Sequence, residues 1–219
     1  MKEKNKQFDK ENTKLLRFSI KDVTIHQQKN CYQGFFKMDE YQLSHRLYEG
    51  GESEVLSREV FERGHAVVLI PYDAQNDRVV LLEQFRVGAI GHGDSPWLLE
   101  FVAGMFGKDE SPIDVAIREA KEEADLTITE AQIDKVMEYF SSPGGMSEVI
   151  HLYVANITSG NVEGVHGLAC EGEDILLHVM PREQAFSLLE NGKITNAATI
   201  IGLQWLQNNF QQLQRKWSS

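Results

Sequence analysis

Three glutamates lie close together in one strongly patterned stretch of the chain. Glu119, Glu122 and Glu123 stand at i, i+3 and i+4, and at about 100° per residue a helix brings them to one face. Like charges at this spacing repel each other, and a nearby cation would relieve the repulsion. Mg²⁺ is often held by a few carboxylates together with water and phosphate oxygens. The spacing therefore allows a magnesium site for phosphate chemistry, with a solvated acidic helix face as the alternative.

The residues around these glutamates predict the helix that must position them. Ser111 can cap a helix, Pro112 suits its first turn, and Asp114 completes a capping box. Apolar residues then recur at helical spacing, namely Ile113, Ile117, Ala120 and Ala124. We expect a helix over 111–124 whose apolar stripe packs on a sheet and whose glutamates lie on the opposite face.

The segment GMFGKDESPIDVAIREAKEEADL resembles the Nudix signature, G-x5-E-x7-R-E-U-x-E-E-x-G-U with U aliphatic. The matching positions are Gly104, Glu110, Arg118, Glu119, Ala120, Glu122, Glu123 and Leu126. Asp125 departs from the pattern, which has glycine there. Because aspartate tolerates the left-handed conformation of a helix end, this departure concerns local backbone geometry more than metal binding. The resemblance implies a Nudix fold, with a mixed sheet sandwiched between helices, and hydrolysis of a substituted diphosphate.

The resemblance also implies a metal centre built mainly from the signature. Glu119 and Glu123 would be the main ligands, with Glu122 as a nearby acidic helper. Gly104 would let the backbone approach the ion, which makes the carbonyl of Ala103 a further candidate ligand. The implied cofactor is Mg²⁺, with about two to three ions in the presence of substrate and with Mn²⁺ as a substitute.

Further roles fall on Arg118 and on an acidic, glycine-rich loop at residues 158–174. Arg118 would orient the glutamates by ion pairing, with Glu110 as its structural partner. Long loops of this kind are often active-site segments. In the family this loop closes over the substrate and delivers the general base, which matches Glu171, while Glu173 would touch a metal ion.

Nearly the whole chain from about Leu16 resembles bacterial ADP-ribose pyrophosphatases within this family. The resemblance runs through REVFERGHAVVLIP, EQFR, PWLLEFVAGM, GLACEGEDI and PREQAF. Pro143, which 16 residues separate from Leu126, resembles the proline marker of that group, although SSPGGMSE also fits a simple turn. The implied reaction is Mg²⁺-dependent hydrolysis of ADP-ribose to AMP and ribose 5-phosphate.

Four further positions match substrate-binding residues of that group. Phe35 and Arg58 match the pair that sandwiches the adenine ring, a stacking arrangement with independent physical sense, although Phe35 also fits a sheet core. Arg86 matches an arginine that grips the diphosphate, and a planar guanidinium suits phosphate oxygens. Glu148 matches a residue bonded to the terminal ribose. For Arg86 and Glu148 the alternative is an ordinary surface charge.

Two other functions share these features. A Nudix hydrolase of another nucleoside diphosphate sugar, such as GDP-mannose or ADP-glucose, would carry the same signature. A non-catalytic module that senses ADP-ribose would be favoured by loss of the metal glutamates. All three glutamates are present in this chain, which favours an enzyme.

The rest of the chain predicts an α/β (α+β) protein with three parts. Residues 1–14 are polar and charged, and we expect them to be flexible. Residues 15–62 carry short β-branched and aromatic runs separated by turns, which is typical of antiparallel β-hairpins. Residues 63–219 mix strands and helices and would form the catalytic domain. By resemblance, the hairpin domain would be exchanged within a homodimer and would contribute to the adenine pocket.

Composition limits which classes of binding partner and which cellular compartment are expected. The net charge of −11 argues against a nucleic-acid or membrane-surface binder and favours a small-molecule substrate. The two cysteines, Cys31 and Cys170, are too few for a disulfide framework, and no apolar stretch has the length of a signal peptide or a membrane span. We therefore expect a cytoplasmic location.

Overall fold

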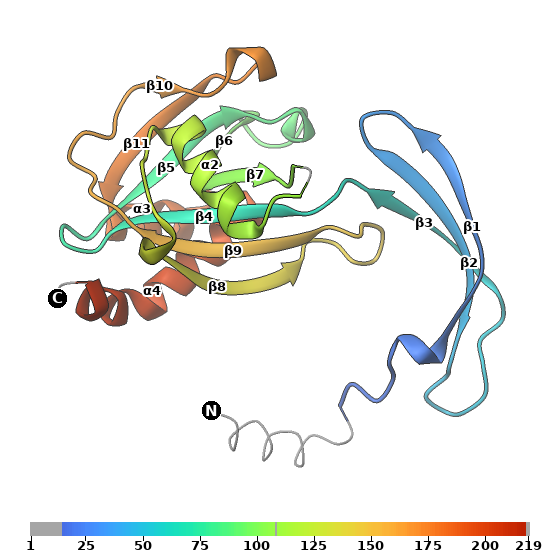
Figure 1. The fold of residues 1–219 in the computed structure, drawn as a ribbon. Coiled ribbons are helices and arrows are strands. Elements are labelled where there is room, and N and C mark those ends of the chain that lie inside the picture. Colours follow the sequence, from blue (N-terminus) through green and yellow to red (C-terminus); the bar gives the residue numbers. More distant parts are fainter. Residues whose placement is uncertain (1–14, 108, 218–219) are drawn as a thin grey trace. The chain divides into compact units, whose positions relative to one another are not determined.

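The computed structural model describes residues 15–107 and 109–217, which divide into two compact units. Unit 1 comprises the described residues up to Arg63 together with Ser142–Ser147, and unit 2 comprises Gly64–Ser141 and the residues from Glu148 onward (Figure 1). The expectation that residues 1–14 are flexible concerns a part of the chain outside the described residues.

Unit 1 is a three-stranded antiparallel sheet in the order β1-β2-β3, as the hairpin pattern predicted. A short 3-10 turn, η1 (Ile20–Asp22), precedes the strands, which are β1 (Val23–Gln33), β2 (Lys37–His45) and β3 (Leu56–Glu62). The only buried residues in the described part of this unit are polar, Asp39 and Ser44. Among the described residues, the sheet therefore has no apolar core of its own.

The turn at Ser142–Ser147, which contains the proline marker, is attached to β3. Phe61 N–H donates to the carbonyl of Gly145 at 2.8 Å, and Ser147 N–H donates to the carbonyl of Phe61 at 3.3 Å. A distant part of the sequence thus joins unit 1, which the hairpin pattern of residues 15–62 did not predict.

Unit 2 is built on a mixed sheet, as predicted, and this sheet has eight strands. Its main path runs β10-β11-β5-β4-β9-β8, with β6 paired to β5 and β7 paired to β4. The strands are β4 (Ala66–Asp73), β5 (Arg78–Phe85), β6 (Trp97–Glu100), β7 (Val102–Met105), β8 (Ile133–Phe140), β9 (Val149–Asn156), β10 (Val165–His166) and β11 (Ile175–Pro181). β4 and β9 are parallel, and the other pairs are antiparallel.

Helices cover both faces of this sheet (Figure 1). They are α2 (Pro112–Ala124), α3 (Arg182–Glu190) and α4 (Ala197–Trp217). Short 3-10 turns lie elsewhere in the unit, namely η2 (Val87–Ala89) between β5 and β6, η3 (Glu130–Gln132) between α2 and β8, and η4 (Ala169–Glu171) between β10 and β11. Side chains alternate along β4, so Val67 and Leu69 share a buried cluster with α2 whereas Val68 and Ile70 share one with α3 and α4. The predicted sandwich is confirmed.

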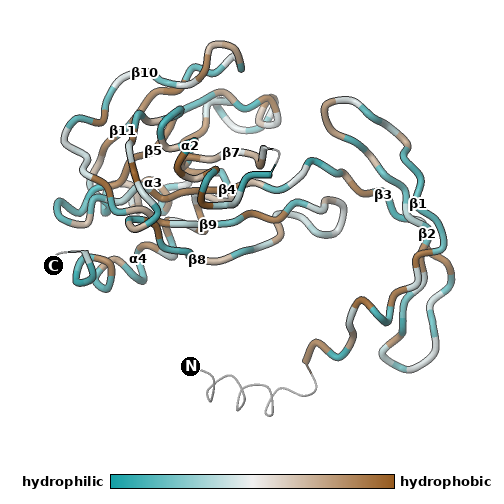
Figure 2. Tube along the Cα trace, in the orientation of Figure 1, coloured by the Kyte–Doolittle hydropathy of each residue, from teal (hydrophilic) through white to brown (hydrophobic). Residues whose placement is uncertain are grey.

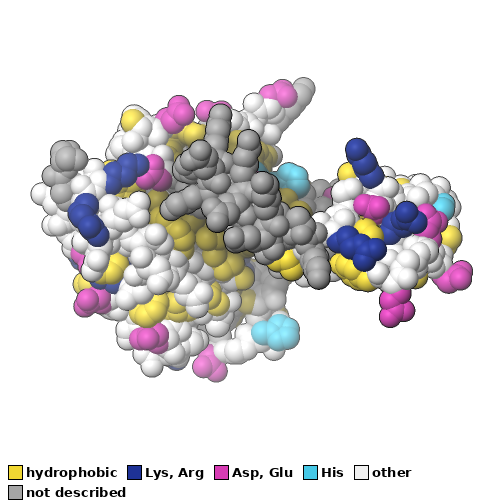
Figure 3. Space-filling model, turned by 90° about the horizontal axis from the view of Figure 1, so that it is seen from below, with side chains coloured by type: hydrophobic (Ala, Val, Ile, Leu, Met, Phe, Trp, Pro, Cys, Tyr) yellow, Lys and Arg dark blue, Asp and Glu magenta, His cyan; other side chains and the backbone are white. Residues whose placement is uncertain are grey.

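The two units differ in the hydropathy of their residues. Figure 2 shows hydrophobic stretches along β9 and α4, and mostly hydrophilic residues along β1 and β2. On the face of unit 2 seen in Figure 3, hydrophobic side chains gather over a continuous area and charged side chains are scattered around it. No described helix combines the length and the apolar character needed to cross a bilayer.

Candidate active site

Helix α2 begins as its sequence predicts. The hydroxyl of Ser111 accepts from the N–H of Asp114 at 3.3 Å, and the carboxylate of Asp114 accepts from the N–H of Ser111 at 3.1 Å. These two bonds satisfy N–H groups that have no partner within the helix. The first turn of α2, and with it the orientation of the glutamates two turns later, is therefore held by local interactions.

The expectation that all three glutamates face away from the core was wrong. Glu123 is 1% exposed, and the side chains of Glu119 and Glu122 are 13% and 28% exposed. At about 100° per residue, Glu123 and Glu119 adjoin the arc of Ala116 and Ala120, which pack on the sheet. The acidic face thus borders the apolar face, and the helix turns Glu119 and Glu123 inward.

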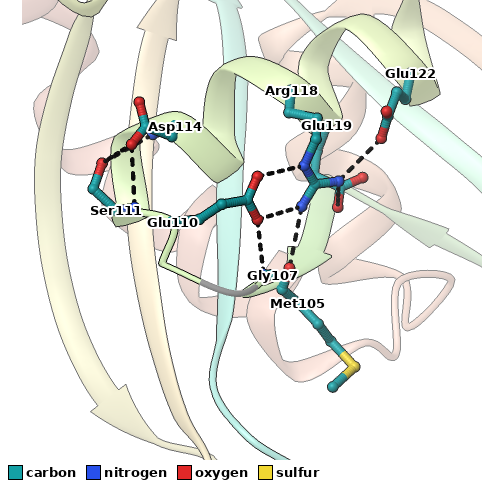
Figure 4. A network of polar contacts seen from close by, with 8 residues as sticks. All are labelled: Met105, Gly107, Glu110, Ser111, Asp114, Arg118, Glu119 and Glu122. Carbon is teal, nitrogen blue, oxygen red and sulfur yellow. Dashed lines mark hydrogen bonds and ion pairs between the residues drawn. The ribbon is translucent and has the colours of Figure 1, made fainter.

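Arg118 organises the solvent side of this cluster (Figure 4). Its Nε and Nη2 donate to the two carboxylate oxygens of Glu110 at 2.8 and 3.1 Å. Its Nη1 donates to Glu119 at 2.7 Å and to Glu122 at 3.0 Å, and Nη2 also donates to the carbonyl of Met105. The pairing of Glu110 with Arg118 that the signature suggested is therefore present.

Strand β7 binds Glu123 through a backbone N–H group and lies directly against the side chain of Glu119. Ala103 N–H donates to the Oε2 of Glu123 at 2.9 Å, which connects the predicted backbone ligand to the buried carboxylate. A Cβ atom built on Gly104 would overlap the carboxylate of Glu119. Glycine is thus required at this position by the path of the Glu119 side chain.

Burial makes both inner carboxylates hard to ionise. Desolvation raises the pKa of Glu119 to about 7 against the opposing effect of Arg118, and the charges of Glu122 and Glu173 add to the rise. Desolvation likewise raises the pKa of Glu123 to about 8, with Glu119 and Glu173 adding to it and the Ala103 N–H and Arg86 opposing it. A site whose buried carboxylates are costly to ionise is a candidate for binding positive charge.

The acidic loop brings Glu173 to these carboxylates and leaves Glu171 apart. Glu173 Oε2 accepts from the N–H of Leu168 at 3.0 Å, and its charge acts on both Glu119 and Glu123. Gly167 N–H donates to the carbonyl of Glu122 at 3.3 Å and ties the loop to α2. Glu171 lies exposed in η4, and its side chain has no bonded partner among the described residues.

The donor set fits a hard divalent cation. Glu119, Glu123 and Glu173 each have one carboxylate oxygen bonded to an N–H group, and the second oxygen of each has no hydrogen-bond partner among the described residues. Oxygen ligands of this kind suit Mg²⁺ or Mn²⁺. Across residues 15–107 and 109–217, no group of three or more acidic, histidine or cysteine side chains is close enough together to hold a metal ion. Binding an ion at Glu119, Glu123 and Glu173 would therefore require these carboxylates to move closer together.

Arg86 also belongs to this region, together with a residue that the sequence analysis missed. Arg86 follows β5, and its charge acts on Glu123. Its Nε and Nη2 donate to the Oε2 of Glu100 at 3.0 and 2.7 Å, and Glu100 is only 3% exposed. A glutamate inside the apolar run WLLEFV was the available signal, since a buried charge requires a partner.

The other predicted substrate residues are Phe35, Arg58 and Glu148. In unit 1, Phe35 is 88% exposed and packs edge-on against Phe36, so it is not core, and Arg58 donates to the carbonyl of Ser57. In unit 2, Glu148 is buried and accepts from the hydroxyl of Ser141 at 2.6 Å. Their predicted roles in binding adenine and ribose stay predictions.

Asp125 ends α2 in the left-handed conformation, with φ of +50°, where the signature has glycine. A side chain in this region is strained, and the surface ion pair of Asp125 with Lys121 offsets the strain only slightly. We therefore expect Asp125→Gly to raise Tm by about 2 °C and to leave kcat within about twofold of wild type, by scanning calorimetry and steady-state kinetics. A large fall in activity would mean that Asp125 takes part in the chemistry.

Comparison with known proteins agrees with this geometry. A family model described as "NUDIX domain" matches residues 62–200. The ADP-ribose pyrophosphatase of Escherichia coli (strain K12) is 47% identical over 201 residues, which cover 92% of this chain and 95% of that protein. The GDP-mannose pyrophosphatase of Escherichia coli O139:H28 (strain E24377A / ETEC) is 32% identical over 190 residues, or 85% of this chain and 96% of that protein.

The fold has a close counterpart among solved structures. A crystal structure of an ADP compounds hydrolase superposes with a TM-score of 0.67, covering 90% of this chain and 98% of that one, at 20% sequence identity. Such a likeness supports the fold alone. Since the family model spans well over half of the sequence and the relatives align along nearly all of it, this chain belongs to the Nudix family.

Proposed function

We propose that this protein hydrolyses the diphosphate bond of ADP-ribose, with Mg²⁺, to give AMP and ribose 5-phosphate. The observation that carries the proposal is the cluster of Glu119, Glu123 and Glu173 beside Arg86, in a chain whose relatives at 47% identity are ADP-ribose pyrophosphatases. Carboxylates and a guanidinium in one place can hold metal ions and an anionic diphosphate together.

Each residue of the cluster has a distinct part in the proposed reaction. Glu119, Glu123 and Glu173, with the carbonyl of Ala103, hold divalent ions. When bound, such ions neutralise phosphate oxygens and lower the pKa of a coordinated water molecule. Arg86 donates hydrogen bonds to the diphosphate.

Two further residues act around this centre. Arg118 keeps Glu119 and Glu122 in position through its two short bonds to them. Glu171 removes the proton from the attacking water, and because it lies exposed in η4, the loop has to bring it to the substrate. Catalysis then depends on positioning and charge stabilisation, without a serine or cysteine nucleophile.

Phosphorus NMR of the products formed from ADP-ribose and Mg²⁺ in ¹⁸O-labelled water tests this function. We expect AMP and ribose 5-phosphate, with the label in one product only, which identifies the attacked phosphorus. Parallel reactions with GDP-mannose and ADP-glucose test the alternative that the 32% identical GDP-mannose pyrophosphatase suggests. Faster turnover of either sugar nucleotide would replace the proposal, and binding of ADP-ribose without cleavage would favour a sensor.

Metal binding is expected to release protons and to weaken as the pH falls. In the metal-free protein the raised pKa values, about 7 for Glu119 and about 8 for Glu123, leave both carboxyls largely protonated at pH 6. An ion must displace those protons, so its affinity should fall by up to about five-hundredfold between pH 8 and pH 6. Calorimetry of Mg²⁺ binding in two buffers with different protonation enthalpies measures the released protons. A pH-independent affinity would contradict this assignment of ligands.

We further propose a homodimer in which the unit 1 sheets are exchanged, as the family resemblance suggests. A three-stranded sheet needs a packed apolar face to be stable, and the described part of unit 1 buries no hydrophobic residue. Instead it exposes Ile25, Tyr32 and Phe35 by 54%, 66% and 88%. A second copy is the simplest cover for these side chains.

Sedimentation velocity is expected to show a dimer, and Ile25→Asp is expected to shift the protein toward monomer and to lower its Tm. A charge placed on an apolar contact loses its hydration when the contact forms. Lys29→Asp, at an exposed position on the same strand, serves as the control. A wild-type protein that sediments as a monomer at micromolar concentration would contradict the dimer.

A cytoplasmic location is likewise a proposal, supported by the presence of only two cysteines, Cys31 and Cys170.

A further inference from the structure

The side chain of Arg86 is held along one edge of its guanidinium. Both Nε and Nη2 donate to a single oxygen, the Oε2 of Glu100, at 3.0 and 2.7 Å. The two residues are carried by neighbouring antiparallel strands, since Arg86 follows β5 and Glu100 ends β6. The Nη1 amino group has no hydrogen-bond partner among the described residues, and it remains available to a ligand.

The other oxygen of Glu100 is bonded to the start of α4. Asn196 Nδ2 donates to Glu100 Oε1 at 2.9 Å, while Asn196 Oδ1 accepts from the N–H and the hydroxyl of Thr199 at 3.0 and 3.1 Å. A backbone N–H can only donate, so the Asn196 oxygen has to face Thr199 and its NH₂ group has to face Glu100. The orientation of the whole chain of bonds is thus determined from the helix end to the arginine.

We infer that Glu100, oriented by Asn196 at the N-terminus of α4, is the positioning residue that holds Arg86 in place for an anionic diphosphate. This inference rests on the proposed function, in which Arg86 binds the diphosphate. Glu123 and Glu173 also lie near Arg86, and without a competing anchor their carboxylates would draw the guanidinium toward the metal ligands. Glu100 occupies that edge of the guanidinium and keeps the remaining N–H groups for substrate oxygens.

A pair of substitutions can separate this role from simple stability. In Glu100→Gln, the Gln oxygen can still accept from Arg86, but its NH₂ group then faces the NH₂ group of Asn196, and two donors oppose each other. In Glu100→Gln with Asn196→Asp, the new Asp accepts from the Gln NH₂ with one oxygen and caps Thr199 with the other. Asp is also a good helix cap, so the double variant restores the bonding pattern without a charge next to Arg86.

The experiment measures the Kd of the non-hydrolysable α,β-methylene analogue of ADP-ribose by calorimetry, together with kcat and KM. We expect Arg86→Ala to raise Kd by about a hundredfold and Glu100→Gln to raise it by about tenfold. Glu100→Gln in the Arg86→Ala background should add less than about twofold, because a positioning residue has nothing left to position. Adding Asn196→Asp to Glu100→Gln should recover about threefold or more.

Asp77→Asn is the matched control. Asp77 forms a comparable ion pair with the buried Arg182, with both N–O distances at 2.9 Å, and has no bond to the site. It should lower Tm while leaving Kd and KM unchanged. A Kd for Glu100→Gln equal to wild type, or an unchanged tenfold effect in the Arg86→Ala background, would overturn the inference. If Arg86→Ala itself binds and cleaves normally, the proposed role of Arg86 fails first.

Discussion

Glu123→Gln is expected to lower kcat for ADP-ribose by at least about a thousandfold, because it removes a buried metal ligand while keeping the shape of the side chain. The Gln oxygen can still accept the hydrogen bond from Ala103 N–H, so the fold should persist. Steady-state kinetics with saturating Mg²⁺ measures the loss. Glu190→Gln, at an exposed position at the end of α3, serves as the control and should retain wild-type turnover.

The same substitution should stabilise the metal-free protein at alkaline pH. The pKa of Glu123 is raised from 4.5 to about 8 in the folded state, so the folded protein holds a proton that the unfolded chain has already lost. The contribution of the Glu123 carboxyl group to the folding stability therefore falls as the pH rises from 4.5 to about 8. Above that range the full cost of ionising this buried group destabilises the folded protein. Glu123→Gln should have the higher Tm there without metal, and added Mg²⁺ should stabilise only the wild type strongly. Equal Tm values at alkaline pH would contradict the buried, ionisable ligand.

Gly104→Ala is expected to lower kcat by about a hundredfold or more with a modest loss of stability. The added methyl group would occupy the space of the Glu119 carboxylate, so Glu119 has to leave its position beside Arg118. Displacement of a metal ligand by about 1 Å can cost this much in rate. Kinetics and the shift of Tm on adding Mg²⁺ should both report the change.

Gly88→Ala is the matched control for this variant. A Cβ on Gly88 meets no atom within 4 Å, and its backbone is not in the left-handed region. It should keep wild-type kcat and the wild-type response to Mg²⁺. If Gly104→Ala also behaved like the wild type, then Glu119 would not need its observed position, and its role as a ligand would be in doubt.

Most of the fold could be predicted because long elements carry a clear period. The cap at Ser111 and the apolar spacing that follows it were sufficient to place α2, and the short β-branched and aromatic runs predicted the antiparallel strands of unit 1. Strands β6 and β7 were missed. They have four residues each, too few for an alternating pattern to be distinguished from an irregular segment.

The site was predictable in its residue types and less so in its geometry. The spacing of Glu119 and Glu123 indicated a shared helix face, but their burial depends on β7 packing across the helix, which no local pattern reveals. Glu100 was missed because its importance comes from Arg86 and Asn196, which are 14 and 96 residues away in sequence. Contacts of such long range arise only from the tertiary structure.

The parallel pairing of β4 with β9 constrains the order in which unit 2 can be assembled during synthesis. Ala66 lies beside Ile150, so β4 has no neighbour on that side until the ribosome has released a further 84 residues. All eight residues of β4 are buried in the finished protein, and a half-made chain would leave this apolar strand uncovered. Closing so long a loop is slow, and the nascent chain is exposed to aggregation during that time. Chaperones that bind nascent chains at the ribosome and shield apolar strands should therefore raise the yield of this protein. The gain should be larger than for a protein whose central strands are neighbours in sequence.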